Sequence, residues 1–249
     1  MRYLLMPIAA PMQSWGDTVV SGDDRTTWPF PTHSGIAGMI CAALGVDRKD
    51  EDRLGQVHDG LDILVAEIRK GTIQQDYYSV KDVIRATGQT DGAIIGRKYY
   101  LADYLFLTVV CIRQECPFSL EQIGQALLFP CYALYAGRRA YTLSIPPVFH
   151  ENGLPQIMEW DDPVDEISKL VQDSKYLSRI FSNLVIAEKL SNALNIYVDV
   201  KSDVFKRHES AIPGIPYRVS DRYHGRYRNW GYREFDEREI GILPVTIKE

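Results

Sequence analysis

The chain has 249 residues, of which 45% are hydrophobic and 24% are charged, and its net charge is −5. This composition is typical of a globular protein and excludes a mainly disordered one. The longest apolar stretch, residues 35–46, is too short for a membrane span of about 20 residues. A free-standing nucleic-acid binder is usually basic, so the total charge argues against that class of protein.

The charge is nevertheless unevenly distributed along the chain. Residues 150–166 carry only acidic charges, whereas residues 206–233 are dominated by Arg and Lys. The four cysteines form no Cys-x-x-Cys pair, so a zinc site and a disulfide scaffold are both disfavoured. We therefore expect free thiols in the reducing cytoplasm and no metal or other cofactor.

The first 150 residues predict one compact unit. In chain order we expect a strand at 2–8, a helix at 32–45, a surface helix at 47–61, strands at 62–68, 99–112 and 141–149, and a helix at 119–128. Thr32 or Ser34 can cap the start of the first long helix and Gly45 its end, and Ser119 and Gln122 have capping-box spacing. The β-α-β-β-α-β order predicts an α+β, ferredoxin-like or RNA-recognition-motif-like domain.

A long polar insertion at about 75–100 interrupts this pattern between two strands. Loops of this length are usually functional or disordered, and we expect a protruding β-hairpin thumb. Residues 151–249 then predict a C-terminal α+β extension, with helices near 164–170 and 177–189, a strand at 193–200 and an apolar end at 240–247. The extension contains the basic, aromatic segment 206–233.

Residues 217–233 within that segment interleave Arg with Tyr, Trp and His. Arg binds phosphate in a bidentate manner and aromatic rings stack on bases, a combination typical of single-stranded RNA recognition. Gly137-Arg138-Arg139 and the basic residues of the insertion are weaker signals of the same kind. The alternatives are an ordinary solvated surface for these Arg residues and a disordered loop for the insertion.

Hydrolytic motifs are not found in the sequence. No His pair has metal-ligand spacing, and neither a nucleophile elbow nor a phosphate-binding P-loop occurs. His33 or His224 could act as a general base toward a ribose hydroxyl, and a nuclease of that kind needs almost no motif. A metal-independent endoribonuclease therefore stays as an alternative function, and an unrelated small-molecule enzyme as a third.

Several short motifs resemble the CasD family of type I-E CRISPR Cascade subunits. They are Gln13-Ser14-Trp15-Gly16, the run from Pro31 to Gly45, the run from Arg97 to Asp103, and Tyr135-Ala136-Gly137-Arg138-Arg139 followed by Pro146. Their order matches over roughly residues 1–147, and the Arg/Tyr-rich tail is similar in character. One departure is His33, where the family pattern often has Lys, so that a titratable group replaces a fixed charge.

The resemblance implies a non-catalytic, RNA-binding scaffold subunit of an antiviral ribonucleoprotein complex in the cytoplasm. Such subunits cap the 5′ handle of the guide CRISPR RNA, join the CasC backbone subunits to the large subunit CasA, and meet target DNA only through the complex. The resemblance implies neither a cofactor nor a membrane. Because related subunits of another subtype cut precursor RNA, it also leaves a metal-independent endoribonuclease that processes precursor guide RNA as the alternative. The expected RNA-binding residues are Trp15, Arg25, Thr32, His33, Ser34, Lys81, Arg85, Arg97, Lys98, Tyr99, Arg138, Arg139, Arg222, Tyr223, Arg226 and Arg228.

Overall fold

The computed structural model describes residues 1–16, 24–84, 87–88, 90–113, 115–182, 184, 193–214, 216–224 and 234–246. Its main sheet has seven strands in the order β11-β12-β10-β3-β6-β1-β9, and every neighbouring pair is antiparallel. These strands are β1 (Arg2–Ala9), β3 (Leu61–Arg69), β6 (Leu105–Ile112), β9 (Ile157–Glu159), β10 (Ala193–Asp199), β11 (Tyr217–His224) and β12 (Glu234–Thr246). The predicted α+β class is confirmed as a mixed fold with antiparallel sheets.

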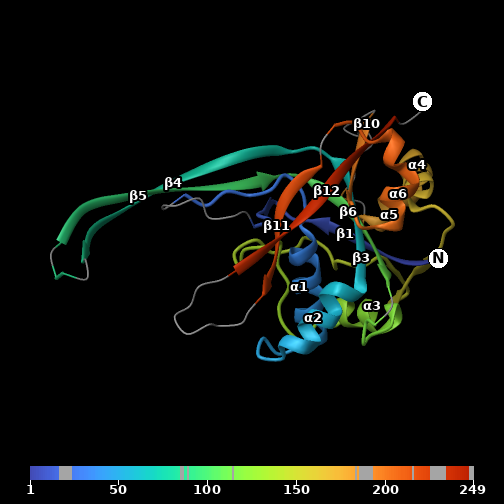
Figure 1. Ribbon diagram of the computed structural model, residues 1–249, viewed down its shortest axis with the longest axis horizontal. Helices are drawn as coiled ribbons and strands as arrows, with labels where there is room; N and C mark the ends of the chain where they lie inside the picture. Colours follow the sequence, from blue (N-terminus) through green and yellow to red (C-terminus); the bar gives the residue numbers. More distant parts are fainter. Residues whose placement is uncertain are drawn as a thin grey trace.

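Helices cover both faces of this sheet (Figure 1). On one face lie α1 (His33–Leu44), α2 (Glu51–Gly60) and α3 (Leu120–Leu128), and on the other α4 (Pro163–Gln172), α5 (Ser174–Ile180) and α6 (Asp203–His208), which a 3-10 turn at Glu209–Ala211 follows. Successive residues of a strand point to opposite faces, so Leu4 and Met6 enter one hydrophobic core while Tyr3 and Leu5 enter the other. Burial on both faces explains why β1 is apolar throughout.

Local signals fix the ends of the two helices that the sequence predicts best. The Thr32 side chain accepts a hydrogen bond from the amide of Gly35 at the start of α1, and Gly45 ends α1 in the left-handed conformation. Ser119 and Gln122 form the expected capping box at the start of α3. These contacts confirm the predicted boundaries at Thr32, Gly45 and Ser119.

The strand predicted at 141–149 is wrong. That segment is irregular apart from a single bridge between Tyr135 and Thr142, and β9 supplies the strand that pairs with the free edge of β1. The amides of Ser144 and Phe149 still donate to carbonyls of β1, but Pro146 and Pro147 lie between them and have no amide hydrogen to donate. Since β9 and β10 belong to the same sheet as β1, residues on both sides of position 150 build it.

Two further boundaries differ from the sequence-based expectation. The apolar run 99–112 is divided between two strands by Asp103, which has a positive φ of 61°. The helix expected at 177–189 begins earlier and ends as α5 at Ile180, and residues 183 and 185–192 lie outside the described part of the chain.

The insertion between β3 and β6 is a hairpin of β4 (Thr72–Ile84) and β5 (Thr90–Ala102), which projects from the body (Figure 1). Its register runs from Thr72 opposite Ala102 to Ile84 opposite Thr90, and the short strand β2 (Met12–Gln13) pairs with β5 at its base. A second small hairpin joins β7 (His150–Glu151) to β8 (Leu154–Pro155). The long hairpin therefore has one strand edge, that of β4, with no partner among the described residues.

Candidate nucleic-acid interface

Three segments that are distant in sequence meet where the hairpin leaves the body. Arg25 lies along β5: its amide donates to the Arg97 carbonyl at 2.8 Å and its carbonyl accepts from the Tyr99 amide at 2.8 Å. The Arg138 guanidinium reaches the Arg25 carbonyl at 3.5 Å. The structure thus brings together five of the predicted site residues, which are Arg25, Arg97, Lys98, Tyr99 and Arg138.

Cationic and aromatic side chains lie next to one another across this junction, and two of the rings, Tyr100 and Tyr141, are buried. The Lys98 ammonium lies 4.4 Å from the ring centroid of Tyr78, and Tyr100 follows Lys98 on the same face of β5. The ring of Tyr100 is 6.0 Å from that of Tyr141, and the Arg138 guanidinium lies 5.6 Å from the Tyr141 ring and donates to its hydroxyl at 3.1 Å. We call Tyr78, Lys98, Tyr100, Tyr141 and Arg138 the basic–aromatic row.

Glycines allow the close approaches within the row. Gly96 lies opposite Tyr78 in the hairpin, and the Tyr78 ring occupies the space that a Cβ at position 96 would need. Gly137 has a φ of +90°, and a Cβ there would lie 1.6 Å from the Ser14 carbonyl oxygen. The amide of Ser14 donates to the carbonyl of Ala136 at 3.0 Å, so the turn that carries Arg138 and the exposed Arg139 is held against the body.

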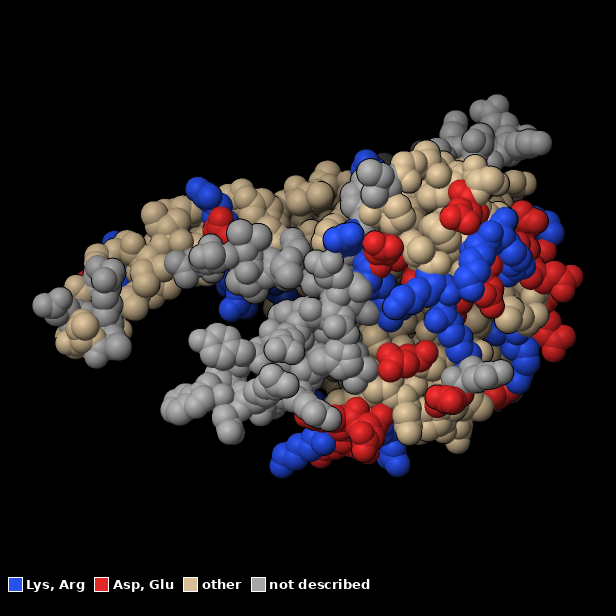
Figure 2. All heavy atoms as spheres, viewed as in Figure 1, with Lys and Arg blue, Asp and Glu red and all other residues tan. Residues whose placement is uncertain are grey.

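The electrostatics of the junction are mainly positive. Arg25, Arg97, Lys98, Arg138 and Arg139 gather there, and Figure 2 shows Lys and Arg beside a few Asp and Glu on the hairpin. Asp24 offsets part of the charge, because it accepts from the Arg97 amide at 3.0 Å and lies 3.6 Å from its guanidinium. Burial raises the pKa of the Tyr100 hydroxyl, so this group stays protonated at neutral pH and donates to Gln74 at 3.0 Å.

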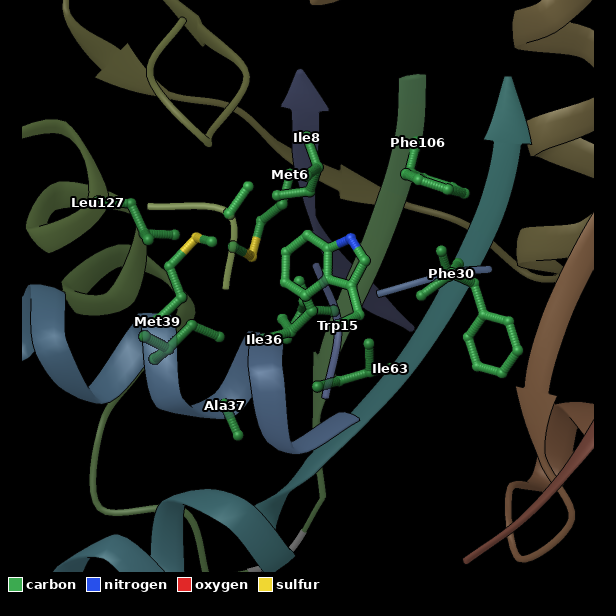
Figure 3. Close-up of a cluster of buried hydrophobic side chains, with 14 of the residues drawn as sticks. Met6, Ile8, Trp15, Phe30, Ile36, Ala37, Met39, Ile63, Phe106 and Leu127 are labelled. Carbon is green, nitrogen blue, oxygen red and sulfur yellow. The ribbon is translucent and has the colours of Figure 1, made fainter. Parts of the chain in front are cut away.

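The structure corrects the expected role of Trp15, which does not offer its ring to RNA. The residue is 1% exposed and packs among Met6, Ile8 and Ile36 in the core (Figure 3), and its indole nitrogen donates to the Gln13 side chain at 3.1 Å. A buried ring cannot stack on a base, so Trp15 supports the adjacent Ser14–Gly137 contact from inside.

The start of α1 is also largely inside the protein. Thr32 and His33 are 5% and 6% exposed, and only Ser34 is half-buried. Thr32 caps the helix, while His33 faces the Leu61 carbonyl with its Nε2 at 3.3 Å and packs on the ring of His58 at 4.6 Å. Direct phosphate contacts by Thr32 and His33 are therefore corrected to structural roles.

Of the remaining predicted residues, some lie elsewhere in the structure and the others lie outside its described part. Lys81 is exposed on β4, and Arg85 lies outside the described residues. Arg222 and Tyr223 belong to β11, the outermost strand, beside an irregularity of its register, and only their main chain is described. Arg226 and Arg228 lie outside the described part of the chain.

The sequence analysis did not select Tyr78, Tyr100 and Tyr141, although they complete the row. For Tyr141 the available signal was its spacing, three residues after Arg138. For Tyr78 and Tyr100 it was a cross-strand pattern, which needs the hairpin register and cannot be obtained from one strand alone.

The described residues contain neither a cluster that could bind a metal ion nor a helix that could span a membrane. Among them, no three His, Cys, Asp or Glu side chains come together in a way that could hold a metal ion. Within the same residues, none of the helices has the length and apolar character that crossing a membrane requires. The junction offers cations, which can bind phosphate groups, and the half-buried rings of Tyr78 and Tyr99, on which bases can stack.

Comparison with known proteins identifies the family. The family described as CRISPR-associated protein (Cas_Cas5) matches residues 3–204, which is most of the chain. The chain belongs to the Cas_Cas5 family. The CRISPR system Cascade subunit CasD of Escherichia coli (strain K12) is 29% identical over 155 residues, which cover 58% of this chain and 68% of that protein. The CasD resemblance of the sequence motifs is thereby confirmed.

Two solved structures share the fold of this chain over nearly its whole length. A chain of a CRISPR RNA-guided surveillance complex superimposes with a TM-score of 0.66 at 22% identity, covering 98% of this chain and 90% of that one. A second structure, described as a Cas protein, gives 0.60 at 23% identity, with 98% and 95% covered. At these identities the likeness concerns the fold alone, and it includes the C-terminal part that lies beyond the family match.

Proposed function

We propose that this chain is a non-catalytic Cascade subunit that binds and caps the 5′ handle of a guide CRISPR RNA and links the CasC backbone to the large subunit CasA. The observation that carries the proposal is the basic–aromatic row, which a Cas_Cas5 family member would need in order to hold single-stranded RNA. The CasD similarity supports the choice of complex. The protein would work in the cytoplasm and reach target DNA only as part of that assembly.

The row suits a single strand bent around the base of the hairpin. Arg138 and Lys98 present charge to phosphates, and the half-buried rings of Tyr78 and Tyr99 offer faces on which bases of any sequence can stack. Tyr100 and Tyr141 are 9% and 7% exposed, so they support the site from inside and do not stack on bases. Because the Tyr141 hydroxyl and ring both hold Arg138, the guanidinium is oriented before RNA arrives. Pre-orientation reduces the entropy lost on binding.

The fold supports the assembly role in this proposal. The elements β1, α1, β3, β6, α3 and β9 follow one another with strand order β3-β6-β1-β9, which we assign to a ferredoxin-like domain. The β4–β5 hairpin is then the thumb that inserts between neighbouring subunits. Its exposed apolar side chains, among them Ile73, Tyr77 and Ile95, would be covered only in such a complex.

The alternative function as an endoribonuclease needs a general base at the RNA. His33 is 6% exposed and faces a backbone carbonyl, which disfavours it for this task. Incubating the purified protein with labelled repeat RNA in EDTA tests the alternative, because cleavage at one site would overturn the non-catalytic assignment.

A charge-matched pair of variants tests the proposed RNA contact. In Arg138→Ala/Arg139→Ala the guide RNA should be retained less well, and the salt dependence of binding should flatten by about 1.4 in slope, since each lost phosphate contact to a single strand contributes about 0.7. Arg48→Ala/Lys49→Ala removes the same charge from exposed positions before α2 and should change neither quantity. Wild-type retention and slope in the first variant would overturn the proposal.

A further inference from the structure

A second surface with unusual composition begins where α3 ends. Residues 129–133 are all exposed, although none of them is charged, and Phe129 and Tyr132 are 70% and 55% exposed. Tyr135, at 37%, extends the surface toward the basic–aromatic row. We call residues 129–135 the aromatic strip. Large apolar side chains that are exposed close together along a chain are typical of an interaction surface.

The absence of charge distinguishes this strip from the rest of the surface. No Asp, Glu, Lys or Arg occurs anywhere in residues 122–137, in a chain that is 24% charged. Two other uncharged stretches of comparable length, residues 3–16 and 26–46, lie mostly within the core. A loop that only faces solvent would be expected to contain charged residues. Exposure to solvent therefore does not explain the uncharged composition of the strip.

Main-chain hydrogen bonds hold the strip at both ends. The amides of Cys131 and Tyr132 donate to the carbonyls of Ala43 and Ala42 at the end of α1, at 2.9 and 3.2 Å. At the other end, the carbonyl of Ala136 accepts from Ser14 at 3.0 Å. The aromatic side chains are therefore presented from a fixed backbone, which lowers the entropy cost of docking.

From these observations we infer that the aromatic strip docks onto an uncharged, apolar surface of a neighbouring protein subunit. The inference rests on the proposed function and adds to it a protein contact next to the RNA. Cores of protein interfaces are rich in aromatic residues and poor in charge, as the strip is. RNA is the less suitable occupant, because its phosphates need cations and the first cation after Phe129 is Arg138.

The aromatic strip lies next to the proposed RNA site, so a protein docked on the strip would also lie next to the RNA. The strip leads directly into the turn of Gly137 and Arg138, so a subunit docked on Tyr132 and Tyr135 lies beside the RNA that Arg138 holds. The same rigid segment, anchored on Ser14, then fixes the RNA end and the neighbouring protein relative to each other.

The experiment compares Phe129→Ser/Tyr132→Ser with Leu154→Ser, which removes a 64% exposed side chain outside the strip. The probe is the assembly of the other Cascade subunits with guide RNA, purified without this chain. We expect the double variant to join this assembly at least ten-fold more weakly than the wild type, with an unchanged melting temperature and unchanged guide-RNA binding by the isolated chain. Leu154→Ser should behave as the wild type does.

Each of the other possible outcomes would contradict the inference and would point to a different explanation. Full-strength joining by the double variant would overturn it while leaving the proposed function intact. Loss of RNA binding by the isolated double variant would show that the strip is an RNA surface, and wild-type self-association that the variant abolishes would show that a second copy is the occupant. A wild-type chain that does not join the assembly would overturn the proposed function and, with it, this inference.

Discussion

Gly137 lies directly against Ser14, with no room between them for a side chain. A Cβ at position 137 would lie 1.6 Å from the Ser14 carbonyl oxygen, and the φ of +90° is one that other residues rarely adopt. Ser14 and Gly137 belong to two of the motifs by which the sequence resembles the CasD family. Their contact holds the turn that carries Arg138 and Arg139 in place.

Gly137→Ala should therefore be costly for both stability and function. The left-handed conformation and the clash together should lower the free energy of unfolding by at least about 2 kcal/mol, and the displaced turn should weaken guide-RNA retention. Thermal melting and a retention assay measure the two effects. Gly38→Ala is the control, because a Cβ there meets nothing within 4 Å in the interior of α1, and it should stabilise the protein by about 0.5–1 kcal/mol. Equal melting of the two variants would contradict this account.

Local sequence signals predicted the local structure well and the site poorly. The caps at Thr32, Gly45 and Ser119 act within a few residues of themselves, so the sequence alone specified them. The basic–aromatic row instead joins positions 78, 98 and 141, whose proximity depends on the hairpin register and on the Gly137 turn. No pattern within a single segment contains that information.

The local sequence pattern also failed to predict which residues are buried. Trp15 stands beside Gly16 in what the sequence suggests is an exposed turn, yet long-range packing places it in the core. The apolar run 141–149 failed as a strand for a local reason, since Pro146 and Pro147 cannot extend a ladder, and β9 pairs with β1 in its place. The extension could be predicted as α+β, but its place in the same sheet could not.

A buried polar cluster should tie this extension to the first part of the chain. The Asp62 carboxylate accepts from the Ser202 hydroxyl at 2.7 Å and lies 3.1 Å from the Arg113 guanidinium, while Ser202 caps α6. Asp62→Ala leaves the Ser202 hydroxyl without its acceptor and Arg113 without its ion-pair partner, and it should cost about 2 kcal/mol of unfolding free energy by denaturant titration. Glu121→Ala breaks an exposed pair with Arg2 and should cost no more than about 0.5 kcal/mol, and a similar loss in both variants would refute the distinction.

Glu67 makes stability depend on pH in a defined direction. Burial raises the pKa of this carboxyl above its ordinary value of 4.5, although the Tyr197 hydroxyl donates to it at 3.3 Å and Lys70 lies near. The folded protein therefore binds this proton more tightly than the unfolded chain does, and stability falls as the pH rises from about 4.5 through the raised pKa. Glu67→Gln removes the titration, so its melting temperature relative to the wild type should increase between pH 4.5 and 7.5. A difference that is constant with pH would contradict the assignment.

Tyr141 should act on RNA through Arg138. Tyr141→Leu removes both the ring and the hydroxyl that hold the guanidinium. Because the Tyr141 ring is only 7% exposed, we expect guide-RNA binding about two- to thirty-fold weaker, in line with about 0.5–2 kcal/mol for a partly desolvated cation–π pair. Tyr141→Phe keeps the ring and should lose less. Tyr176→Leu removes the matching ring under Arg179 on α5, on the opposite side of the sheet, and should leave RNA binding unchanged. Equal RNA binding by all three variants and the wild type would show that Tyr141 does not contribute to RNA binding.

The hairpin should change its exchange behaviour most on assembly. Along most of its length β4 is bonded only to β5, and Ile73, Tyr77 and Ile95 have no core to pack on, so its amides should exchange fast in the isolated protein. If the hairpin inserts between subunits, residues 73–83 should become strongly protected in the complex, as hydrogen exchange followed by mass spectrometry would show.

Peptides from β3 and β6, in the middle of the main sheet, serve as the internal reference and should exchange slowly in both states. Tyr77→Ser/Ile95→Ser should lower the protection gained in the complex without altering β3 or β6. Equal protection of the hairpin amides in the free and assembled protein would show that the hairpin is not part of the subunit interface.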